Sequence, residues 1–140
     1  MIDIDHFKSI NDCHGHGVGD EVLQAIARLI SGMLRDSDQV ARWGGEEFLV
    51  MLPNTRPDEA VVVIDRIRQA LMRSGVSRTV PDLRVTFSAG VTAVGPQDSL
   101  PAAVGHADQA LYQAKAAGRD RTVAAPPQAQ ARHPPWVVVR

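Results

Sequence analysis

Two groups of acidic residues have the types and spacing needed to bind a divalent cation. Asp3 and Asp5 form an acid-x-acid pair after an apolar start, and Glu46 and Glu47 follow a glycine pair. Carboxylate oxygens are preferred ligands of hard cations such as Mg²⁺. A glycine-rich turn follows Asp5, and turns of this kind offer backbone amides to phosphate. The sequence therefore predicts a site for a metal and a phosphate-bearing ligand, although Gly-Gly-Glu-Glu alone is more often a solvated hairpin tip.

A β-hairpin is expected to carry the second acidic pair. Residues 39–43 and 49–52 are short runs rich in β-branched and apolar side chains, and Gly44 and Gly45 separate them. Glycine accepts the positive φ that a tight turn demands. Glu46 and Glu47 then stand where the returning strand leaves the turn, and adjacent strand residues point to opposite faces of a sheet.

Composition limits the kind of protein. The chain has 140 residues, which suits one domain with its own core, and a net charge of −1, which gives no basic excess for a nucleic-acid partner. Cys13 is the single cysteine, so no disulfide framework is expected and a reducing compartment is predicted. No apolar run approaches the roughly 20 residues that cross a bilayer. These features predict a cytoplasmic domain without a membrane segment.

The remaining elements follow from hydrophobic periodicity. Apolar residues at three- and four-residue spacing predict a helix from Asp20 to about residue 34, with Asp20 as a candidate N-cap. Pro57 is expected to open a second helix that stops near Gly75, and residues 101–117 form a third. Residues 83–89 alternate as a strand that continues to Val94 beyond a bend or bulge at Gly90. The order predicts an α/β sandwich with a mixed, mostly antiparallel sheet.

Two other arrangements of residues resemble metal-binding motifs. An EF-hand loop beginning at Asp3 is excluded, because Phe7 and the missing loop glycine do not fit that motif. A site at His14-x-His16 is weak, since third and fourth ligands at zinc spacing are lacking nearby.

Five ordered blocks of sequence resemble the GGDEF family, the diguanylate cyclases, in the variant whose signature reads Gly-Gly-Glu-Glu-Phe. The resemblance covers roughly residues 1–123. The blocks are Asp3-Ile4-Asp5-His6-Phe7-Lys8, then Ile10-Asn11-Asp12 with Gly15-His16 and Gly19-Asp20, then Arg42-Trp43-Gly44-Gly45-Glu46-Glu47-Phe48, then residues 85–91, and residues 107–119.

The resemblance implies the palm-like fold of nucleotide cyclases, with a central sheet flanked by helices. It also implies a domain truncated at its N-terminus, because the family has a helix and most of the first strand before this start. The chain is then either a fragment of a longer protein or a product that starts internally. Residues 1–123 would be the GGDEF domain, and residues 124–140, rich in Pro, Ala and Gln, a disordered tail. Trp136 to Val139 within this tail suggest no function.

The resemblance also implies roles for single residues. Asp3, Glu46 and the Ile4 carbonyl would hold Mg²⁺ or Mn²⁺, and Glu47 would be a second ligand or a proton acceptor, so that Asp3, Glu46 and Glu47 form the catalytic set. The implied substrate-binding residues are His6, Phe7, Lys8, Asn11, Asp20, Gly44, Gly45, Lys115 and Arg119. For Lys115 and Arg119 a structural explanation is equally good, because cations stabilise a helix C-terminus.

A product site is implied ahead of the hairpin. Arg35 and Asp38 form an Arg-x-x-Asp motif five residues before Gly44, where GGDEF domains bind cyclic di-GMP as an inhibitor; Arg66 is a weaker candidate for a second arginine. Arginine can grip a phosphate or a guanine edge through two hydrogen bonds, and aspartate can accept from guanine. On pattern alone, this charged connector would be solvated surface.

The implied activity is the metal-dependent condensation of two GTP molecules into cyclic di-GMP by a homodimer. The first alternative is a binding module that holds cyclic di-GMP or GTP without turnover. The second is a remnant that does not fold stably, against which a cooperative thermal transition would count.

Overall fold

A five-stranded mixed sheet organises the molecule, with strand order β2-β3-β1-β4-β5. The computed structural model describes residues 1–127. The elements in chain order are β1 (Ile2–Ile4), α1 (Phe7–His14), α2 (His16–Met33), β2 (Gln39–Arg42), β3 (Glu47–Met51), α3 (Pro57–Met72), β4 (Phe87–Val91), α4 (Leu100–Ala116) and β5 (Thr122–Ala124). All pairings are antiparallel except β4 with β5, which confirms the predicted mixed, mostly antiparallel sheet.

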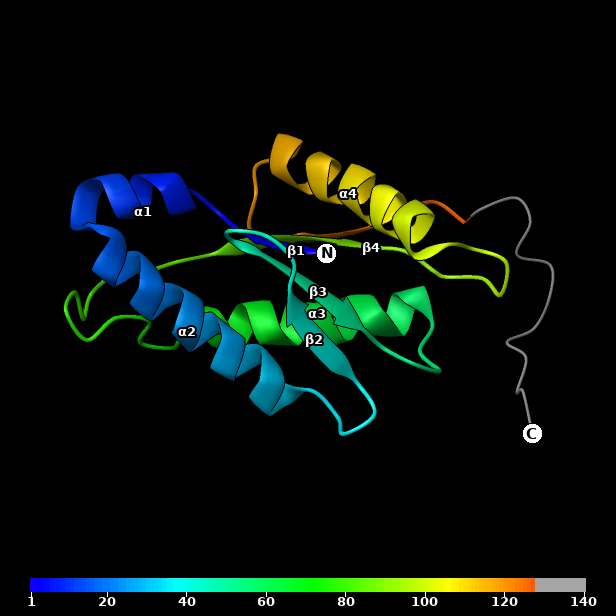
Figure 1. The fold of residues 1–140 in the computed structure, drawn as a ribbon, viewed down its shortest axis with the longest axis horizontal. Helices are drawn as coiled ribbons and strands as arrows, with labels where there is room; N and C mark the ends of the chain where they lie inside the picture. The colour runs from blue at the N-terminus through cyan, green and yellow to red at the C-terminus, as the bar shows by residue number, and fades with distance from the viewer. Residues whose placement is uncertain (128–140) are drawn as a thin grey trace.

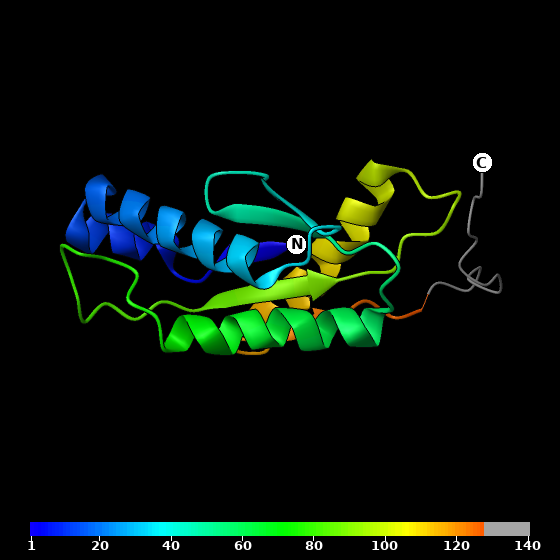
Figure 2. The same cartoon turned by 90° about the horizontal axis from the view of Figure 1, so that it is seen from below.

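Helices cover both faces of the sheet (Figure 1). The larger core packs the apolar faces of α2 and α3 against Ile2, Ile4 and Phe87. A smaller core on the opposite face joins Met1 to Ala107 and Leu111 of α4. Successive strand residues point to opposite faces of the sheet. Ile2 and Ile4 face the larger core, so Asp3, which lies between them in the sequence, faces α4. Figure 2, turned by 90°, shows α3 running along the sheet on the face away from α4.

Four sequence-based expectations about where elements begin and end were wrong. The glycine-rich stretch was expected to be a turn, but α1 and α2 run through it with only Gly15, at φ 88°, between them. Asp20 is therefore inside α2 and is not its N-cap. The strand expected from Leu83 begins at Phe87 and ends at Val91, and α3 ends at Met72 rather than near Gly75.

Gly90 occupies a regular strand position rather than the expected bend or bulge. It pairs with Val123 in the parallel ladder, and its N–H donates to the Met1 carbonyl at 2.8 Å. A Cβ at Gly90 would overlap the Ala107 carbonyl oxygen and come within 2.4 Å of the Leu111 nitrogen, so it would collide with the backbone of α4. The missing side chain therefore lets α4 lie directly on the sheet.

Glu21 ties α2 to the loop that precedes β4. Its carboxylate accepts hydrogen bonds from Ser77 Oγ at 2.5 Å and Thr79 Oγ1 at 2.7 Å, and from the N–H groups of Arg78 and Thr79 at 2.9 and 3.2 Å. These bonds, that of Ser77 first, lower the pKa of Glu21 from 4.5 to about 2. The ionised carboxylate therefore holds loop and helix together.

Replacing Glu21 by Gln should remove an acid-sensitive part of the stability. Because the folded pKa is depressed, ionised Glu21 stabilises the fold above pH 4.5, and this contribution is lost as pH falls toward 2. Urea midpoints should be lower for the variant at neutral pH and should converge with those of the parent at the acid end. Asp82→Asn, an exposed acid in the same loop, is the control. A constant gap across this range would contradict the prediction.

No helix in the described part of the chain is long and apolar enough to cross a membrane.

Candidate functional site

Asp3 and Glu47 face each other across the two central strands. β1 and β3 are antiparallel, and these two residues are direct partners in the register, so their side chains lie on the same face. Asp3 is 6% exposed. Lys115, in the last turn of α4, places its Nζ 2.9 Å from Asp3 Oδ1. The predicted pairing of an N-terminal acid with a hairpin acid is confirmed, and a cation from α4 joins them.

The site carries more negative charge than Lys115 balances. The pKa of Glu47 is raised, first by desolvation and then by the charges of Asp3, Asp108 and Glu46, while Lys115 opposes the shift. Carboxylates on one face that destabilise each other's ionised form favour a cation between them. The donor set, two carboxylates with the Ile4 carbonyl nearby in sequence, is the oxygen chemistry that Mg²⁺ and Mn²⁺ accept. The residues therefore fit a divalent cation.

Protein side chains alone do not complete a metal site. Among residues 1–127, no cluster of three or more His, Cys, Asp or Glu side chains could hold an ion. Mg²⁺ is commonly bound through one or two carboxylates, with its other ligands from water and from substrate phosphates. The acid pair matches that pattern.

The hairpin tip is held by its own backbone and by Arg42. The Arg42 guanidinium donates to the Gly44 and Gly45 carbonyls, with the shortest bond, from Nη2 to Gly45, at 2.7 Å. The Glu46 carbonyl accepts the Ile4 N–H at 3.2 Å, which fixes the tip to β1. The hairpin is confirmed, but the reason given for its glycines was wrong, because neither has a positive φ. Gly44 instead leaves space, since a Cβ there would lie 2.5 Å from Glu47 Oε2.

The start of α1 provides backbone amides beside the site. His6 precedes the helix in a left-handed conformation with φ 56°, and no side chain caps the first turn. Phe7 is buried in the larger core, whereas His6 and Lys8 are exposed. The free N–H groups of a helix N-terminus favour an anion.

Asn11 has an unsatisfied polar atom. Its Oδ1 is buried without a hydrogen-bond partner. It lies against Gly19, where a Cβ would overlap it, and Gly19 precedes Asp20, which is exposed on α2. A buried polar atom without a partner costs about 1–3 kcal/mol, so Asn11 is suited to a ligand that donates a hydrogen bond.

The Arg-x-x-Asp motif forms a turn on the surface. The Arg35 N–H donates to Asp38 Oδ2 at 2.9 Å, and the Asp38 N–H donates to the Arg35 carbonyl at 3.0 Å. The Arg35 side chain is exposed, and so is Arg66 on α3. Within residues 1–127, no hydrogen bond or ion pair joins Arg66 to the motif.

Sequence reasoning misassigned one acid near this site and missed another. Asp5, which the sequence grouped with Asp3 as a candidate ligand, lies just beyond β1 and accepts hydrogen bonds from Thr86 and Ser88 instead. Asp108, on α4, raises the pKa of Glu47 through its negative charge. It lies seven residues before Lys115, a spacing that puts Asp108 and Lys115 on one face of the helix. That spacing was visible in the sequence and could have identified Asp108.

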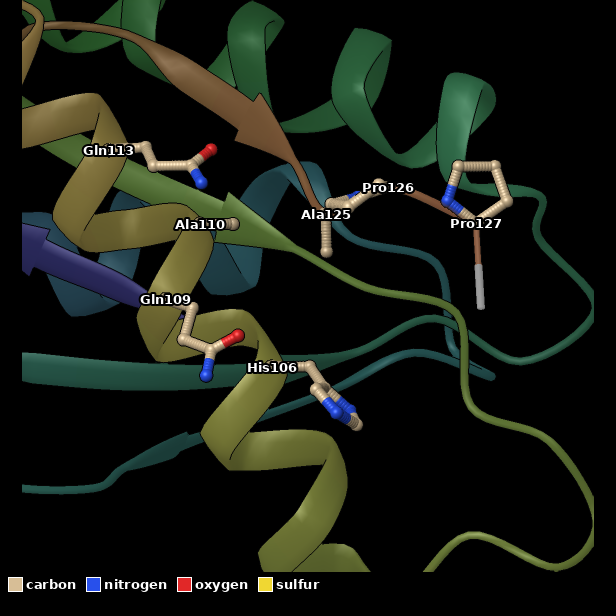
Figure 3. Close-up of a pocket in the computed structure, with 7 residues that line it drawn as sticks. All are labelled: His106, Gln109, Ala110, Gln113, Ala125, Pro126 and Pro127. Carbon is tan, nitrogen blue, oxygen red and sulfur yellow. The ribbon is translucent and has the colours of Figure 1, made fainter. Parts of the chain in front are cut away.

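A separate pocket lies between α4 and the segment after β5. It has a volume of about 220 Å³ and is lined by His106, Gln109 and Gln113 with residues 125–127 (Figure 3). None of the acids described above lines it.

Comparisons with known proteins agree with this arrangement. Residues 1–121 match the family described as "Diguanylate cyclase, GGDEF domain". Diguanylate cyclase A of Treponema denticola is 43% identical over 122 residues, which are 86% of this chain and 33% of that protein. Diguanylate cyclase DgcP of Pseudomonas aeruginosa is 46% identical over 121 residues, 86% of this chain and 18% of that protein. The chain thus spans a third or less of these two relatives.

Solved structures give the same result. The active GGEEF domain of a diguanylate cyclase from Vibrio cholerae matches with a TM-score of 0.81 and 36% identity over 91% of this chain and 81% of that one. The GGDEF domain of DgcB from Caulobacter crescentus, in complex with c-di-GMP, matches with a TM-score of 0.82 and 33% identity over 89% and 74%. The predicted palm-like cyclase fold is confirmed. The chain belongs to the family of GGDEF diguanylate cyclase domains.

Proposed function

We propose that this chain condenses two GTP molecules into cyclic di-GMP. The observation that carries the proposal is the acid pair, Asp3 and Glu47, held on one face of the sheet beside Lys115. In each half-reaction a 3′-hydroxyl oxygen bonds to the α-phosphorus of the other GTP. The bond from that phosphorus to the α,β-bridging oxygen breaks, and pyrophosphate leaves. Two GTP therefore give one cyclic di-GMP, two pyrophosphates and two protons.

Asp3, the Ile4 carbonyl, Glu46 and Glu47 would hold Mg²⁺ or Mn²⁺. A bound divalent cation would lower the pKa of the attacking hydroxyl and stabilise charge on the phosphate. Glu47 is the proposed second ligand or proton acceptor, since its raised pKa favours taking up a proton. Of the hairpin acids, Glu47 is the register partner of Asp3, whereas Glu46 lies in the tip.

Cations and amides around the acid pair would bind the triphosphate. The proposed phosphate-binding groups are the amides of His6, Phe7 and Lys8 at the start of α1, with the side chains of Lys115 and Arg119. Lys115 pairs with Asp3 in this structure. We propose that it contacts phosphate once a metal neutralises Asp3.

Asn11 and Asp20 would read the guanine base. The unsatisfied Asn11 Oδ1 can accept one of the base N–H groups, and the exposed Asp20 carboxylate can accept another. Gly44 and Gly45 would let the nucleotide lie close to the hairpin tip.

The reaction requires two active sites face to face, because each domain would supply one GTP. We therefore propose a homodimer. Product inhibition through Arg35 and Asp38 is also proposed, with Arg66 as a further contact; the related DgcB domain was solved with c-di-GMP. The catalytic domain would be residues 1–123, and residues 124–140 a tail, of which 128–140 lie outside the described part.

The test is incubation of the 140-residue chain with GTP and Mg²⁺, followed by chromatography for cyclic di-GMP and a pyrophosphate assay. Product should form in a 1:2 ratio to pyrophosphate, as the balance above requires. Activity per molecule should rise with protein concentration if the dimer is the active form. Added cyclic di-GMP should inhibit the parent but not Arg35→Ala.

Two negative results differ in meaning. GTP binding without pyrophosphate release would replace the cyclase with a binding module, the alternative function that the exposed Arg35 supports. A cooperatively folded chain that binds neither GTP nor cyclic di-GMP would exclude both functions.

A further inference from the structure

The loop that carries Arg119 has an unusual backbone. Gly118, Arg119 and Asp120 follow one another with φ of 114°, 63° and 45°. Only glycine adopts positive φ freely, and each other residue costs roughly 1–2 kcal/mol there. Such conformations persist only where surrounding groups fix them. The contacts of this loop must therefore hold Arg119 in place.

Asp5 holds the loop from the sheet. It is 4% exposed, and its Oδ2 accepts the Asp120 N–H at 3.1 Å and Thr86 Oγ1 at 2.7 Å. Its Oδ1 accepts Ser88 Oγ at 2.7 Å. Both oxygens are thus engaged by protein donors, and the buried carboxylate serves the loop rather than a ligand.

Arg68 holds the same loop from α3. Its Nη1 lies 2.7 Å from Asp120 Oδ1, and its Nε lies 3.0 Å from Asp65 Oδ1. Asp65 also accepts from Thr122 Oγ1 at 2.9 Å, which anchors the start of β5. The Arg68 side chain is only 17% exposed, so the pair with Asp120 is partly shielded from solvent. Asp120 is therefore fixed by its backbone through Asp5 and by its side chain through Arg68.

The side chain next to this anchor remains available. Arg119 is exposed, and within residues 1–127 its guanidinium makes no hydrogen bond or ion pair. Its N–H donates to the Ala114 carbonyl at 3.0 Å, which joins it to the turn of α4 that carries Lys115. A cation presented from a rigid backbone loses less entropy on binding an anion than one on a mobile loop.

We infer that Asp5 and Arg68 are positioning residues that hold Arg119 toward the triphosphate, an inference that rests on the proposed function. Neither residue needs to touch the nucleotide. Loosening the loop should weaken only those interactions that Arg119 makes, which are with phosphate. GMP, which has the guanine base and the α-phosphate alone, should bind with unchanged affinity.

The test compares two ligands on the 140-residue chain. Guanosine α,β-methylene triphosphate with Mg²⁺ carries all three phosphates but cannot release pyrophosphate, and GMP lacks the outer two. Arg119→Ala should bind the triphosphate analogue about 10-fold more weakly, the cost of a charged hydrogen bond. Arg68→Met should weaken it about 3-fold to 10-fold. Affinity for GMP should stay unchanged in both.

Three controls separate positioning from other effects. Arg73→Met removes the same charge just beyond the end of α3, where the side chain has no ion pair among the described residues, and should have no effect. Arg68→Lys should recover part of the lost affinity. The double variant of Arg68→Met and Arg119→Ala should bind no worse than Arg119→Ala alone, because the first residue acts through the second.

Each outcome decides the question. Loss of analogue affinity in Arg68→Met with unchanged GMP affinity and a non-additive double variant supports the inference. Three results would overturn the inference and leave the proposed function standing. Arg68→Met could lose affinity equally for the analogue and for GMP, or its effect could add to that of Arg119→Ala in the double variant. Arg68→Met could also keep full affinity for the analogue while Arg119→Ala binds it weakly. A folded parent that binds neither ligand would overturn both. If Arg68→Met lacks a cooperative melt, Arg68→Lys is judged by the same criteria.

Discussion

Replacing Glu47 by Gln should reduce cyclic di-GMP formation on the order of 10³-fold while making the folded chain more stable at neutral pH. The loss follows from the proposed role in metal binding or proton transfer, which contributes several kcal/mol to transition-state stabilisation. Glutamine keeps the shape of the side chain, so the hairpin and the contact with Gly44 should persist. The substitution therefore removes charge and basicity alone.

The gain in stability follows from the raised pKa of Glu47. A carboxyl whose folded pKa is raised contributes stability below its usual pKa of 4.5, and this contribution is lost as pH rises through the folded value. At neutral pH the ionised group therefore weakens the fold, and neutral glutamine should relieve that effect. The thermal midpoint of the variant should exceed that of the parent at pH 7, and the difference should shrink toward pH 4.

The measurement pairs a product assay with thermal unfolding at several pH values. Asp82→Asn, which removes one exposed negative charge far along the chain, should change neither quantity. A variant that loses activity together with stability would indicate a structural role for Glu47. Retained activity would remove Glu47 from the chemistry.

Gly90→Ala should destabilise the protein by about 3 kcal/mol, the upper range for forcing extra atoms into a packed interior. The added Cβ meets backbone atoms of Ala107 and Leu111, which cannot move aside without shifting α4. The same helix carries Lys115, so its displacement should also lower activity in the fraction that remains folded. Urea unfolding and the product assay measure the two effects.

Gly105→Ala is the matched control for that substitution. Gly105 lies within α4, and a Cβ added there meets nothing within 4 Å. Alanine in an open helical position should stabilise the chain by roughly 0.5–1 kcal/mol. The same chemical change should thus have opposite signs at the two glycines. A mild effect at Gly90 would mean that α4 can move away from β4 at little cost.

The sequence was sufficient for the features that depend on local patterning. Pro57 was correctly placed at the start of α3, and the predicted final helix differs from α4 by one residue at each end. These signals are short-range, and nothing elsewhere in the fold competes with them. The position of Asp3 opposite Glu47 is a long-range contact, and it was expected from the family resemblance rather than from local pattern.

Features that depend on contacts between distant segments could not be predicted. An isolated glycine in a strand usually marks a bend, so the pattern predicts one at Gly90, whereas the position of α4 explains this glycine. Gly15, Gly17 and Gly19 favour a turn with Asp20 as N-cap, whereas α2 begins at His16 and contains Asp20. Asp5 was grouped with Asp3 by spacing, although its donors come from β4 and the loop before β5.

The hydrogen bond between Asp5 and the Asp120 backbone joins residues 115 positions apart. Contacts of such long sequence separation form late in folding, because the intervening chain must be ordered before they become favourable. The β2–β3 hairpin, in contrast, is local and can form within microseconds. Asp3, Glu47 and Lys115 come from β1, β3 and α4, so they come together only after α4 has packed on the sheet. During synthesis, the proposed phosphate-binding residues would join the acids only after nearly all of the described residues have emerged, so the proposed activity would be absent from shorter nascent chains.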